Sequence, residues 1–296
     1  MRVDTTGWTR RVAVVLVGTA CVVATTACSS DGGSNEGTSS SSATSSDSAR
    51  GTYLALGDSV PFGYRGGATS DFPNDGNFVG YPELVGEELG LGVVNASCPG
   101  ETTASFLDSK AQSNGCENSL QSGFGYRTAY PLHVPYGSVD QSQLDFAVRT
   151  LIETDDVDLV TVQIGANDAF VCQQTTADRC SGQEELQTVV QTVQTNLDRI
   201  LKALREQYDG QIVVVTYYAL NYSDPTGAAT QLLDNGIAQA AQTNGADVAD
   251  GYLAFKATAN QAGGDSVRAG LVLPNDVHPS GQGQQLLADA VAAVVD

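Results

Sequence analysis

Five strand-like runs, most of them continuous and apolar, alternate with helical patterns and constrain the fold of this chain more than any other feature. The runs are rich in Val, Ile and Leu, and they cover residues 52–56, 92–96, 158–164, 211–217 and 246–249. Such runs are typical of strands that are buried on both faces of a parallel sheet. The helical patterns cover residues 81–89, 141–153, 183–208, 228–243 and 281–295. This alternation predicts a three-layer α/β/α sandwich around a central parallel five-stranded sheet.

Polar residues follow two of the predicted strands directly. The first strand runs into Gly57-Asp58-Ser59, and the third runs into Gly165-Ala166-Asn167-Asp168. Functional sites of such sheets form at the carboxyl ends of the strands, so we expect Ser59 and Asn167 to lie close together. Near the end of the chain, His278 supplies a base. A serine that a base can deprotonate, together with amide donors for an oxyanion, indicates acyl transfer.

Four blocks in chain order give the sequence a family resemblance over residues 52–296. Besides Gly57-Asp58-Ser59 and the Gly165 block, they are Asn95-Ala96-Ser97-Cys98-Pro99-Gly100-Glu101-Thr102 and Val277-His278-Pro279. Together these blocks resemble those of the GDSL or SGNH hydrolases, a family of serine esterases, lipases and acetyl-ester hydrolases with a flavodoxin-like fold. The Cys-Pro-Gly step is most similar to the exported actinobacterial branch.

The resemblance implies a role for each matching residue. Ser59 would attack the ester carbonyl, and His278 would take its proton and pass it to the leaving alcohol. The backbone N–H groups of Ser59 and Gly100, with the side-chain amide of Asn167, would hold the oxyanion. The sequence contains no phosphate-binding glycine loop and no clustered metal ligands, so we expect neither a cofactor nor a metal.

One position departs from the family pattern. Members of the family usually carry aspartate three residues before the histidine, where this chain has Asn275, and the nearest aspartate is Asp276. Three arrangements are open: the Asn275 side-chain oxygen, its backbone carbonyl, or Asp276 brought in by a local bulge. We favour an oxygen of Asn275 as the group that orients His278.

The first 50 residues indicate export rather than part of the fold. A basic start precedes the apolar run 12–24, which is too short for a permanent membrane span and typical of a signal peptide. The small residues before Cys28 resemble a bacterial lipoprotein signal, so residues 1–27 are predicted to be removed and Cys28 to be lipidated. Residues 28–50 are rich in Ser and Gly, which predicts a flexible tether before the hydrolase domain 51–296.

The charge of the chain excludes one class of partner. The whole chain carries 14 basic and 34 acidic residues. Loss of residues 1–27 removes three arginines and Asp4, which leaves 11 basic and 33 acidic residues and a net charge of −22. Nucleic acid is therefore not expected as a partner, because phosphate binding depends on clustered Lys and Arg. Lipidated Cys28 would place the protein outside the cytoplasm on the cell membrane; without lipidation it would be secreted.

Four cysteines remain after residue 28, and an even number in an exported chain indicates disulfides. Three pairings are possible, and we favour the local ones, Cys98–Cys116 and Cys172–Cys180. Zinc binding is the weaker interpretation, because neither pair has the C-x-x-C spacing of a zinc site.

The predicted function is a membrane-tethered serine esterase or lipase, which we expect to act as a monomer. Residues 101–140 show no clear element but are rich in aromatic side chains, and long loops of this kind often bind substrate. We expect Tyr126, Tyr130 and Tyr136 to contact an ester, a lipid or an O-acetylated glycan. The alternative is a catalytically decayed lipoprotein that binds lipid or glycan, which Asn275 in place of aspartate would explain.

Overall fold

The structure is a computed structural model that describes residues 50–66, 70–119 and 125–296. The predicted signal peptide, Cys28 and the predicted tether up to residue 49 lie outside the described residues. Among the helices that the structure does describe, none combines the length and the apolar character needed to cross a bilayer.

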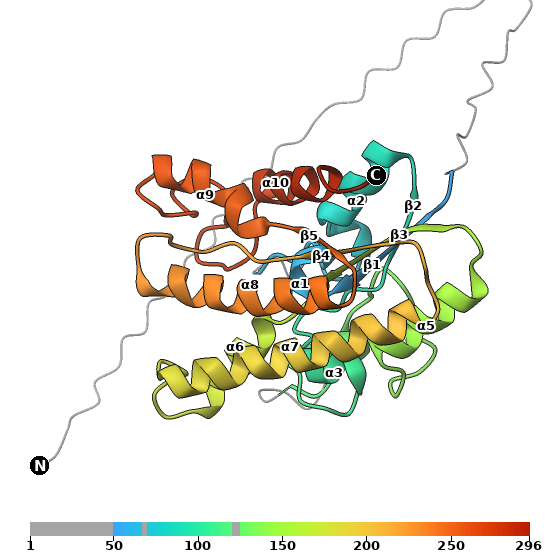
Figure 1. The fold of residues 1–296 in the computed structure, drawn as a ribbon, viewed down its shortest axis with the longest axis horizontal. Coiled ribbons are helices and arrows are strands. Elements are labelled where there is room, and N and C mark those ends of the chain that lie inside the picture. The colour runs from blue at the N-terminus through green and yellow to red at the C-terminus, as the bar shows by residue number, and fades with distance from the viewer. Residues whose placement is uncertain (1–49, 67–69, 120–124) are drawn as a thin grey trace, which may run out of the picture. The chain divides into compact units, whose positions relative to one another are not determined.

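The centre of the molecule is a five-stranded, fully parallel sheet in the order β2-β1-β3-β4-β5 (Figure 1). Its strands are β1 (Thr52–Gly57), β2 (Gly92–Asn95), β3 (Val157–Gln163), β4 (Gln211–Val215) and β5 (Asp247–Ala249). All five predicted strands are present, and each lies within two residues of its predicted limits. The predicted parallel sheet is confirmed.

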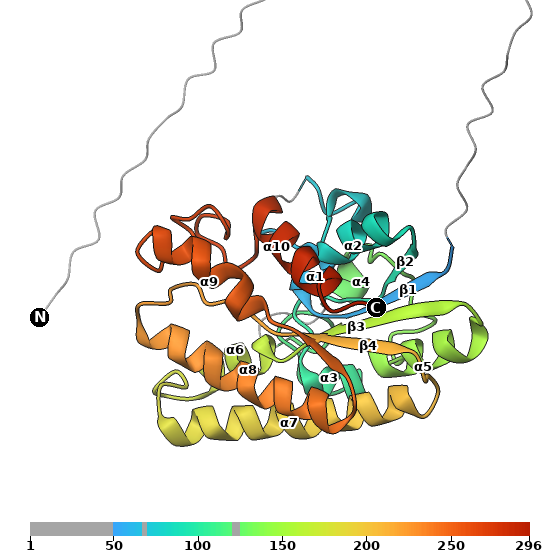
Figure 2. The ribbon, with the colours of Figure 1, turned by 45° about the horizontal axis from the view of Figure 1, so that its top comes forward.

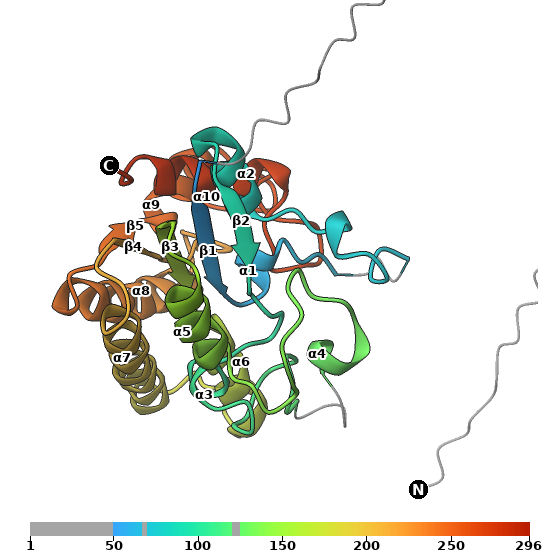
Figure 3. The ribbon, with the colours of Figure 1, turned by 90° about the vertical axis from the view of Figure 1, so that its right-hand side faces the viewer.

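Helices cover both faces of this sheet, which confirms the three-layer sandwich. In Figures 2 and 3, α2, α9 and α10 lie on one side of the strands, and α5, α7 and α8 lie on the other. The helices are α1 (Ser59–Phe62), α2 (Tyr81–Leu89), α3 (Thr103–Leu107), α4 (Tyr126–Ala129), α5 (Gln143–Glu153), α6 (Ala166–Thr175), α7 (Gln183–Arg205), α8 (Pro225–Thr243), α9 (Gly251–Gln261) and α10 (Gly281–Ala292), with a short 3₁₀ turn at Asp75–Asn77.

The core forms where the apolar strands meet the apolar stripes of the helices. In α7 the residues that repeat at three- and four-residue steps are fully buried from the middle of the helix onward, among them Val193, Leu197 and Leu204. They pack into one cluster with the central strands β1 and β3, whose apolar residues are buried on both faces. This rigid layer fixes the positions at which the strands end.

The helical patterns in the sequence did not include the short helices α1, α3 and α4, of which α3 and α4 lie in the segment 101–140 that showed no clear element, or the longer helices α6 and α9. Helix α9 begins after Asp250, whose carboxylate accepts the Leu253 N–H at 2.8 Å and caps the helix. Its buried residues Tyr252, Phe255 and Ala259 follow the helical period. An aspartate before a short apolar stripe is a sequence signal that could have predicted α9. Helix α6 has no comparable apolar stripe, because Asn167 is its only buried residue.

Candidate active site

Ser59 lies at the carboxyl end of β1 and opens the short helix α1. The preceding Asp58 caps this helix, since its Oδ1 accepts the Val60 N–H at 3.0 Å. Gly57, at the end of the strand, is held by Gln143 on α5, which accepts the Gly57 N–H at 2.6 Å and donates to its carbonyl at 3.0 Å. The serine is therefore placed by a strand, a helix cap and a buried amide side chain.

A continuous chain of hydrogen bonds joins Ser59, His278 and Asp276. The Ser59 Oγ lies 2.9 Å from His278 Nε2, and His278 Nδ1 lies 2.5 Å from Asp276 Oδ1. The histidine and aspartate side chains are only 11% and 13% exposed, so little water surrounds the pair. This arrangement can deprotonate the serine hydroxyl and stabilise the imidazolium that results.

The expectation that Asn275 orients the histidine is wrong, because Asp276 holds that position. The loop closes on itself through the Leu273 N–H to the His278 carbonyl at 3.0 Å and the Asp276 N–H to the Leu273 carbonyl at 3.2 Å. Within it Asn275 has a φ of 58°, a left-handed conformation that asparagine tolerates better than most residues. The exposed Asn275 thus turns the chain, and the next carboxylate reaches the ring.

Asp276 is built to stay ionised. Burial alone would raise the pKa of its carboxyl, but the hydrogen bond from His278 and the backbone N–H groups of Gly66 and Val277 outweigh burial and lower that pKa. The Gly66 N–H donates to Oδ2 at 2.7 Å, and the Val277 N–H donates to Oδ1 at 2.7 Å. A fixed negative charge therefore faces Nδ1 of the histidine.

Gly100 and Asn167 follow β2 and β3, and both lie beside the loop that carries Ser59. The Cys98 N–H donates to the Gly57 carbonyl at 3.0 Å, and the Asn167 amide Nδ2 lies 3.4 Å from Asp58 Oδ2. Within the described chain, the N–H groups of Ser59 and Gly100 have no hydrogen-bond acceptor. These two N–H groups and the Asn167 amide are donors available for an oxyanion.

Only glycine fits at position 100. Its φ is 82°, which side chains rarely adopt, and an added Cβ would lie 2.5 Å from the Gly115 nitrogen. The segment around Gly115 is held against this turn by the disulfide Cys98–Cys116 and by the Asn114 N–H, which donates to the Gly100 carbonyl at 2.7 Å. The second disulfide joins Cys172, in α6, to Cys180, which follows that helix. Both predicted pairings are therefore present.

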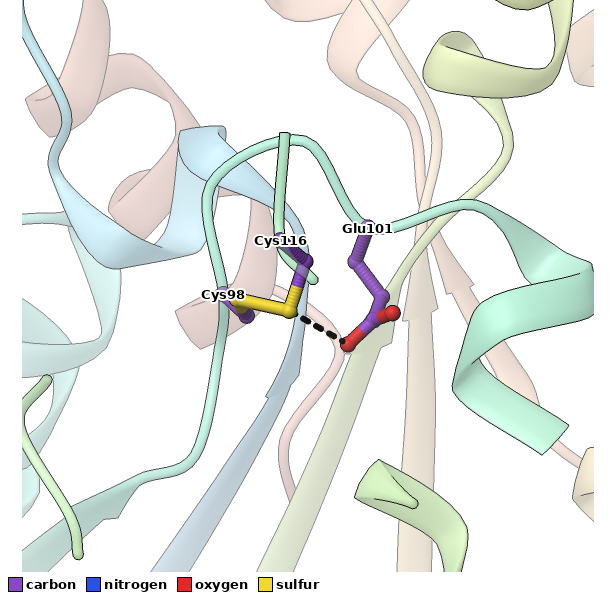
Figure 4. Close-up of side chains that lie close together, drawn as sticks. All are labelled: Cys98, Glu101 and Cys116. Carbon is purple, nitrogen blue, oxygen red and sulfur yellow. Dashed lines mark hydrogen bonds between the residues drawn. A yellow bond between two sulfur atoms is a disulfide. The ribbon is translucent and has the colours of Figure 1, made fainter. Parts of the chain in front are cut away.

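A buried carboxyl group lies against the first disulfide (Figure 4). Glu101 is 2% exposed, and its Oε2 lies 3.3 Å from Cys116 Sγ and 3.1 Å from Gln143 Nε2. Burial raises the pKa of Glu101 to about 7. A disulfide sulfur has no proton to give, so Cys116 does not donate a hydrogen bond to Glu101 in this contact. The two sulfurs are bonded to each other, and the group formed by Cys98, Glu101 and Cys116 is not a metal site.

Asp58 and Asp168 serve as acceptors inside the site rather than as acids or bases. Asp58 accepts from the Tyr217 hydroxyl at 2.6 Å in addition to Val60, and Asp168 accepts from the Thr103 N–H at 2.9 Å and the Thr103 hydroxyl at 2.6 Å. Burial raises the pKa of each carboxyl to about 6. Both residues connect loops that follow different strands.

Of the three tyrosines expected to bind substrate, two lie in an aromatic cluster beside the histidine. Tyr64 packs edge-on against His278 with ring centroids 4.8 Å apart, and its hydroxyl is hydrogen-bonded to that of Tyr126. Tyr126 contacts Tyr130 at 5.2 Å between ring centroids, and Phe72 contacts Tyr130 at 4.8 Å. We call Tyr64, Phe72, Phe78, Tyr126 and Tyr130 the aromatic cluster.

Tyr136 lies outside this cluster. Its hydroxyl donates to the Ala96 carbonyl, and the Arg127 guanidinium lies 3.7 Å from its ring centre. With Tyr130 it lines a cavity of about 550 Å³ whose lining includes neither Ser59 nor His278. The structure therefore does not bring Tyr136 to the reacting groups.

Three contributors to the site were missed in the sequence. Tyr64 follows the serine by five residues, and an aromatic residue at that distance is a usable signal. Gln143 and Asn114 could not be identified from the sequence, because single amide residues in a helix and in a loop have no distinctive pattern. Their importance depends on contacts across 86 and 53 positions of the chain.

Comparisons with known proteins agree with this geometry. The sequence profile of the GDSL-like Lipase/Acylhydrolase family matches residues 55–286. No curated protein matches the chain.

Several solved structures share the fold at low sequence identity. Axe2, an acetylxylan esterase from Geobacillus stearothermophilus, is 18% identical, with a TM-score of 0.52 over 83% of this chain and 94% of its own. Phospholipase A1 from Streptomyces albidoflavus is 21% identical, with a TM-score of 0.52 over 82% of this chain and 98% of its own.

The fold and the family match define a serine ester hydrolase of the α/β/α class. The chain belongs to the GDSL-like lipase/acylhydrolase family.

Proposed function

We propose that this protein is an exported, membrane-tethered esterase or lipase in which Ser59 is the nucleophile, His278 the base and Asp276 the group that orients the base. One observation carries the proposal: Ser59 Oγ, His278 and Asp276 are joined by hydrogen bonds of 2.9 and 2.5 Å at the carboxyl edge of the sheet. Serine requires such a base to become nucleophilic.

Acylation follows from these contacts. As Ser59 Oγ attacks the ester carbonyl, its proton moves to His278 Nε2, which lies 2.9 Å away. The imidazolium that forms faces the Asp276 carboxylate, which stabilises its charge and holds Nδ1 as the protonated nitrogen. His278 then gives the proton to the leaving alcohol, and an acyl-serine remains. Water then attacks the acyl-serine while His278 takes its proton; His278 passes that proton to Ser59 Oγ as the bond to the acyl group breaks, which releases the carboxylic acid and restores the serine.

The tetrahedral intermediate carries its charge on the former carbonyl oxygen. In the proposed mechanism the N–H groups of Ser59 and Gly100 and the amide of Asn167 donate to this oxygen. Each is fixed before the reaction: Ser59 by α1, Gly100 by its turn, and Asn167 by the first turn of α6. Donors that need no rearrangement stabilise the transition state more than the ground state.

The substrate class is proposed as acyl or acetyl esters, on lipids or on envelope glycans. The aromatic cluster beside His278 supports either, since aromatic rings pack against acyl chains and also against sugar rings. Two structural neighbours are an acetylxylan esterase and a phospholipase, and their folds do not separate these classes. A profile of hydrolysis against acyl chain length separates them: an optimum at acetate favours deacetylation, and an optimum at longer chains favours lipase action.

The catalytic proposal is tested by Ser59→Ala. The variant loses hydrolysis of p-nitrophenyl acetate and butyrate, because no other group can form the acyl-enzyme. Ser138→Ala, at an exposed serine, is the matched control and keeps the wild-type rate. Hydrolysis by Ser59→Ala at the wild-type rate would refute the assignment of the nucleophile.

Membrane tethering is proposed from the sequence that precedes the hydrolase domain. The lipoprotein-like signal that ends before Cys28 and the Ser- and Gly-rich stretch after it support a lipid anchor with a flexible tether. In cells, Cys28→Ser is expected to abolish metabolic labelling with a palmitate analogue and to release the protein from the membrane fraction. Retained labelling of this variant would contradict the anchor.

A catalytically decayed binding protein is the other candidate. The argument for this candidate was that Asn275 stands where the family usually has aspartate. Because Asp276 is hydrogen-bonded to His278, that argument no longer holds. Ligand binding without turnover on short and long acyl esters would reinstate it.

A further inference from the structure

Asn167 has an amide that could face the reacting carbonyl with either end. Its side chain is 4% exposed and lies in the first turn of α6. Rotation of the amide by 180° exchanges its oxygen and its NH₂ group with almost no change in shape. Only the NH₂ group can donate to an oxyanion. The neighbours of Asn167 must therefore select the correct orientation.

On one side of Asn167 the selecting residue is Asn114. The Asn114 Nδ2 donates to Asn167 Oδ1 at 2.9 Å. The amide of Asn114 is itself oriented, because Gln174 on α6 donates through Nε2 to Asn114 Oδ1 at 2.7 Å. The oxygen of Asn114 is thus used by Gln174, and its NH₂ group is left to face Asn167.

On the other side the selecting residue is Asp58. Its Oδ2 accepts from the Tyr217 hydroxyl at 2.6 Å and lies 3.4 Å from Asn167 Nδ2. If the Asn167 amide were reversed, its oxygen would face the Asp58 carboxyl oxygen and its NH₂ group would face that of Asn114. Both contacts would be repulsive, so the observed orientation is the one that its neighbours permit.

Asn114 also supports the second proposed donor. Its backbone N–H donates to the Gly100 carbonyl at 2.7 Å, and the adjoining Gly115 approaches Gly100 so closely that no Cβ fits between them. The disulfide Cys98–Cys116 fixes both ends of this contact. Asn114 therefore links the Gly100 turn after β2 to the start of α6, in addition to the Thr103–Asp168 contact.

We infer that Asn114 is a positioning residue of the oxyanion hole, which sets the amide of Asn167 so that its NH₂ group faces the oxyanion. The inference rests on the proposed function. It adds a residue, outside the family motifs quoted above, that acts on the transition state only through Asn167 and Gly100.

A double-mutant cycle tests the inference with p-nitrophenyl acetate as the substrate. Asn114→Ala removes one oriented hydrogen bond and is expected to lower kcat about 10-fold with little change in KM, since the oxyanion is present only in the transition state. Asn167→Ala is expected to lower kcat about 100- to 1,000-fold. In the Asn167→Ala background, Asn114→Ala should have almost no further effect, because its target is gone.

Asn118→Ala is the matched control. Asn118 belongs to the same loop, and its amide donates to the Ser109 carbonyl at 3.0 Å rather than to Asn167. This variant is expected to keep the kcat of the wild type. An equal loss in Asn118→Ala, an unchanged kcat in Asn114→Ala, or full additivity in the cycle would each overturn the inference.

A measurement that needs no turnover separates this inference from the proposed function. The side-chain amide signals of Asn167 are assigned in a ¹⁵N–¹H spectrum by their loss in Asn167→Ala. They are expected to shift in Asn114→Ala and to stay in place in Asn118→Ala. Unchanged Asn167 signals in Asn114→Ala would overturn the inference. Inactivity of the wild type with the expected spectral shift would instead refute the hydrolase mechanism alone.

Discussion

The two halves of the site are held in different ways. The oxyanion half, around Gly100 and Asn167, follows strands of the central sheet and is connected by a buried disulfide and buried carboxyl groups. The base half is the loop 273–278, which follows no strand of the sheet directly but lies between α9 and α10, and it is held by a few hydrogen bonds. Among them are those from Gly66 to Asp276 and from the Tyr218 hydroxyl to the Val277 carbonyl, each 2.7 Å long.

The difference between the two halves shows which parts of the site a sequence motif can predict. Residues that follow strands are placed by the sheet, so their positions follow from the sequence blocks. The orientation of His278 depends on the conformation of a single loop residue, Asn275, with a φ of 58°. A local turn can therefore substitute an aspartate two residues before the histidine for the one that the family usually has three residues before it.

The largest expected effect separates the two candidates within the base half. Asp276→Asn should lower kcat by about 10⁴-fold, the cost of the same change in a serine protease triad. Asn275→Gly, which keeps the left-handed turn while it removes the side chain, should keep kcat within a few-fold of wild type. Steady-state kinetics on p-nitrophenyl butyrate measure both. The reverse ranking would show that Asn275 orients the histidine after all.

The two disulfides are expected to differ in their effect on catalysis. Loss of Cys98–Cys116, by paired substitution to alanine, is expected to cost about 3 kcal/mol of stability, and loss of Cys172–Cys180 about 2.5 kcal/mol. Only the first lies against Gly100. We expect it alone to lower kcat, by about 10- to 100-fold, because oxyanion geometry tolerates little displacement. Equal kcat losses in the two double variants, assayed well below their melting temperatures, would contradict this.

The buried Glu101, in the oxyanion half, is expected to make the stability of the protein depend on pH. Burial raises the pKa of Glu101 from 4.5 to about 7, so between these values the folded state binds more protons than the unfolded state. Stability is therefore lost as the pH rises through this window, by up to about 3 kcal/mol. Glu101→Gln should remove this loss and gain stability relative to wild type at pH 8 but little at pH 4.5.

Urea unfolding at both pH values measures the effect of Glu101→Gln. The exposed Glu87→Gln serves as control and should change stability equally at the two pH values. A stability difference between Glu101→Gln and wild type that does not grow with pH would show that the buried carboxyl has an ordinary pKa.

The smallest expected effect concerns the aromatic cluster. Tyr130 is 39% exposed and contacts Tyr126 and Phe72, so its ring can pack against substrate. Tyr130→Ala should raise KM by about 3- to 10-fold with kcat nearly unchanged, whereas Tyr130→Phe keeps the ring and should match wild type. A fall in kcat without a change in KM would place Tyr130 in the support of His278 instead.

The fold was predictable because its strands are continuous apolar runs and its longest helix has a clear apolar stripe. The blocks around Ser59, Gly100, Asn167 and His278 were predictable for a related reason: they follow strands or precede a helix, and their residue types suit acyl transfer. The residue that orients His278 could not be predicted from the sequence, because the choice between Asn275 and Asp276 depends on one backbone angle.

Hydrogen bonds between residues far apart in the chain also could not be predicted from the sequence. Gln143 contacts Gly57 across 86 positions, and Asn114 contacts Asn167 across 53 positions, and neither has a local pattern. Tyr136 was misplaced for the opposite reason, since an aromatic residue in a long loop suggested substrate contact while its hydroxyl is bonded to Ala96. Contacts of this kind depend on the packing of whole elements.

The most direct test of the central claim is to map the residue that reacts with a fluorophosphonate probe. The protein is labelled and digested, and the adduct is located by mass spectrometry. We expect the adduct on Ser59, with labelling greatly slowed in His278→Ala, because the serine lies 2.9 Å from its base. An adduct on another residue, or labelling of Ser59→Ala equal to that of the wild type, would contradict it.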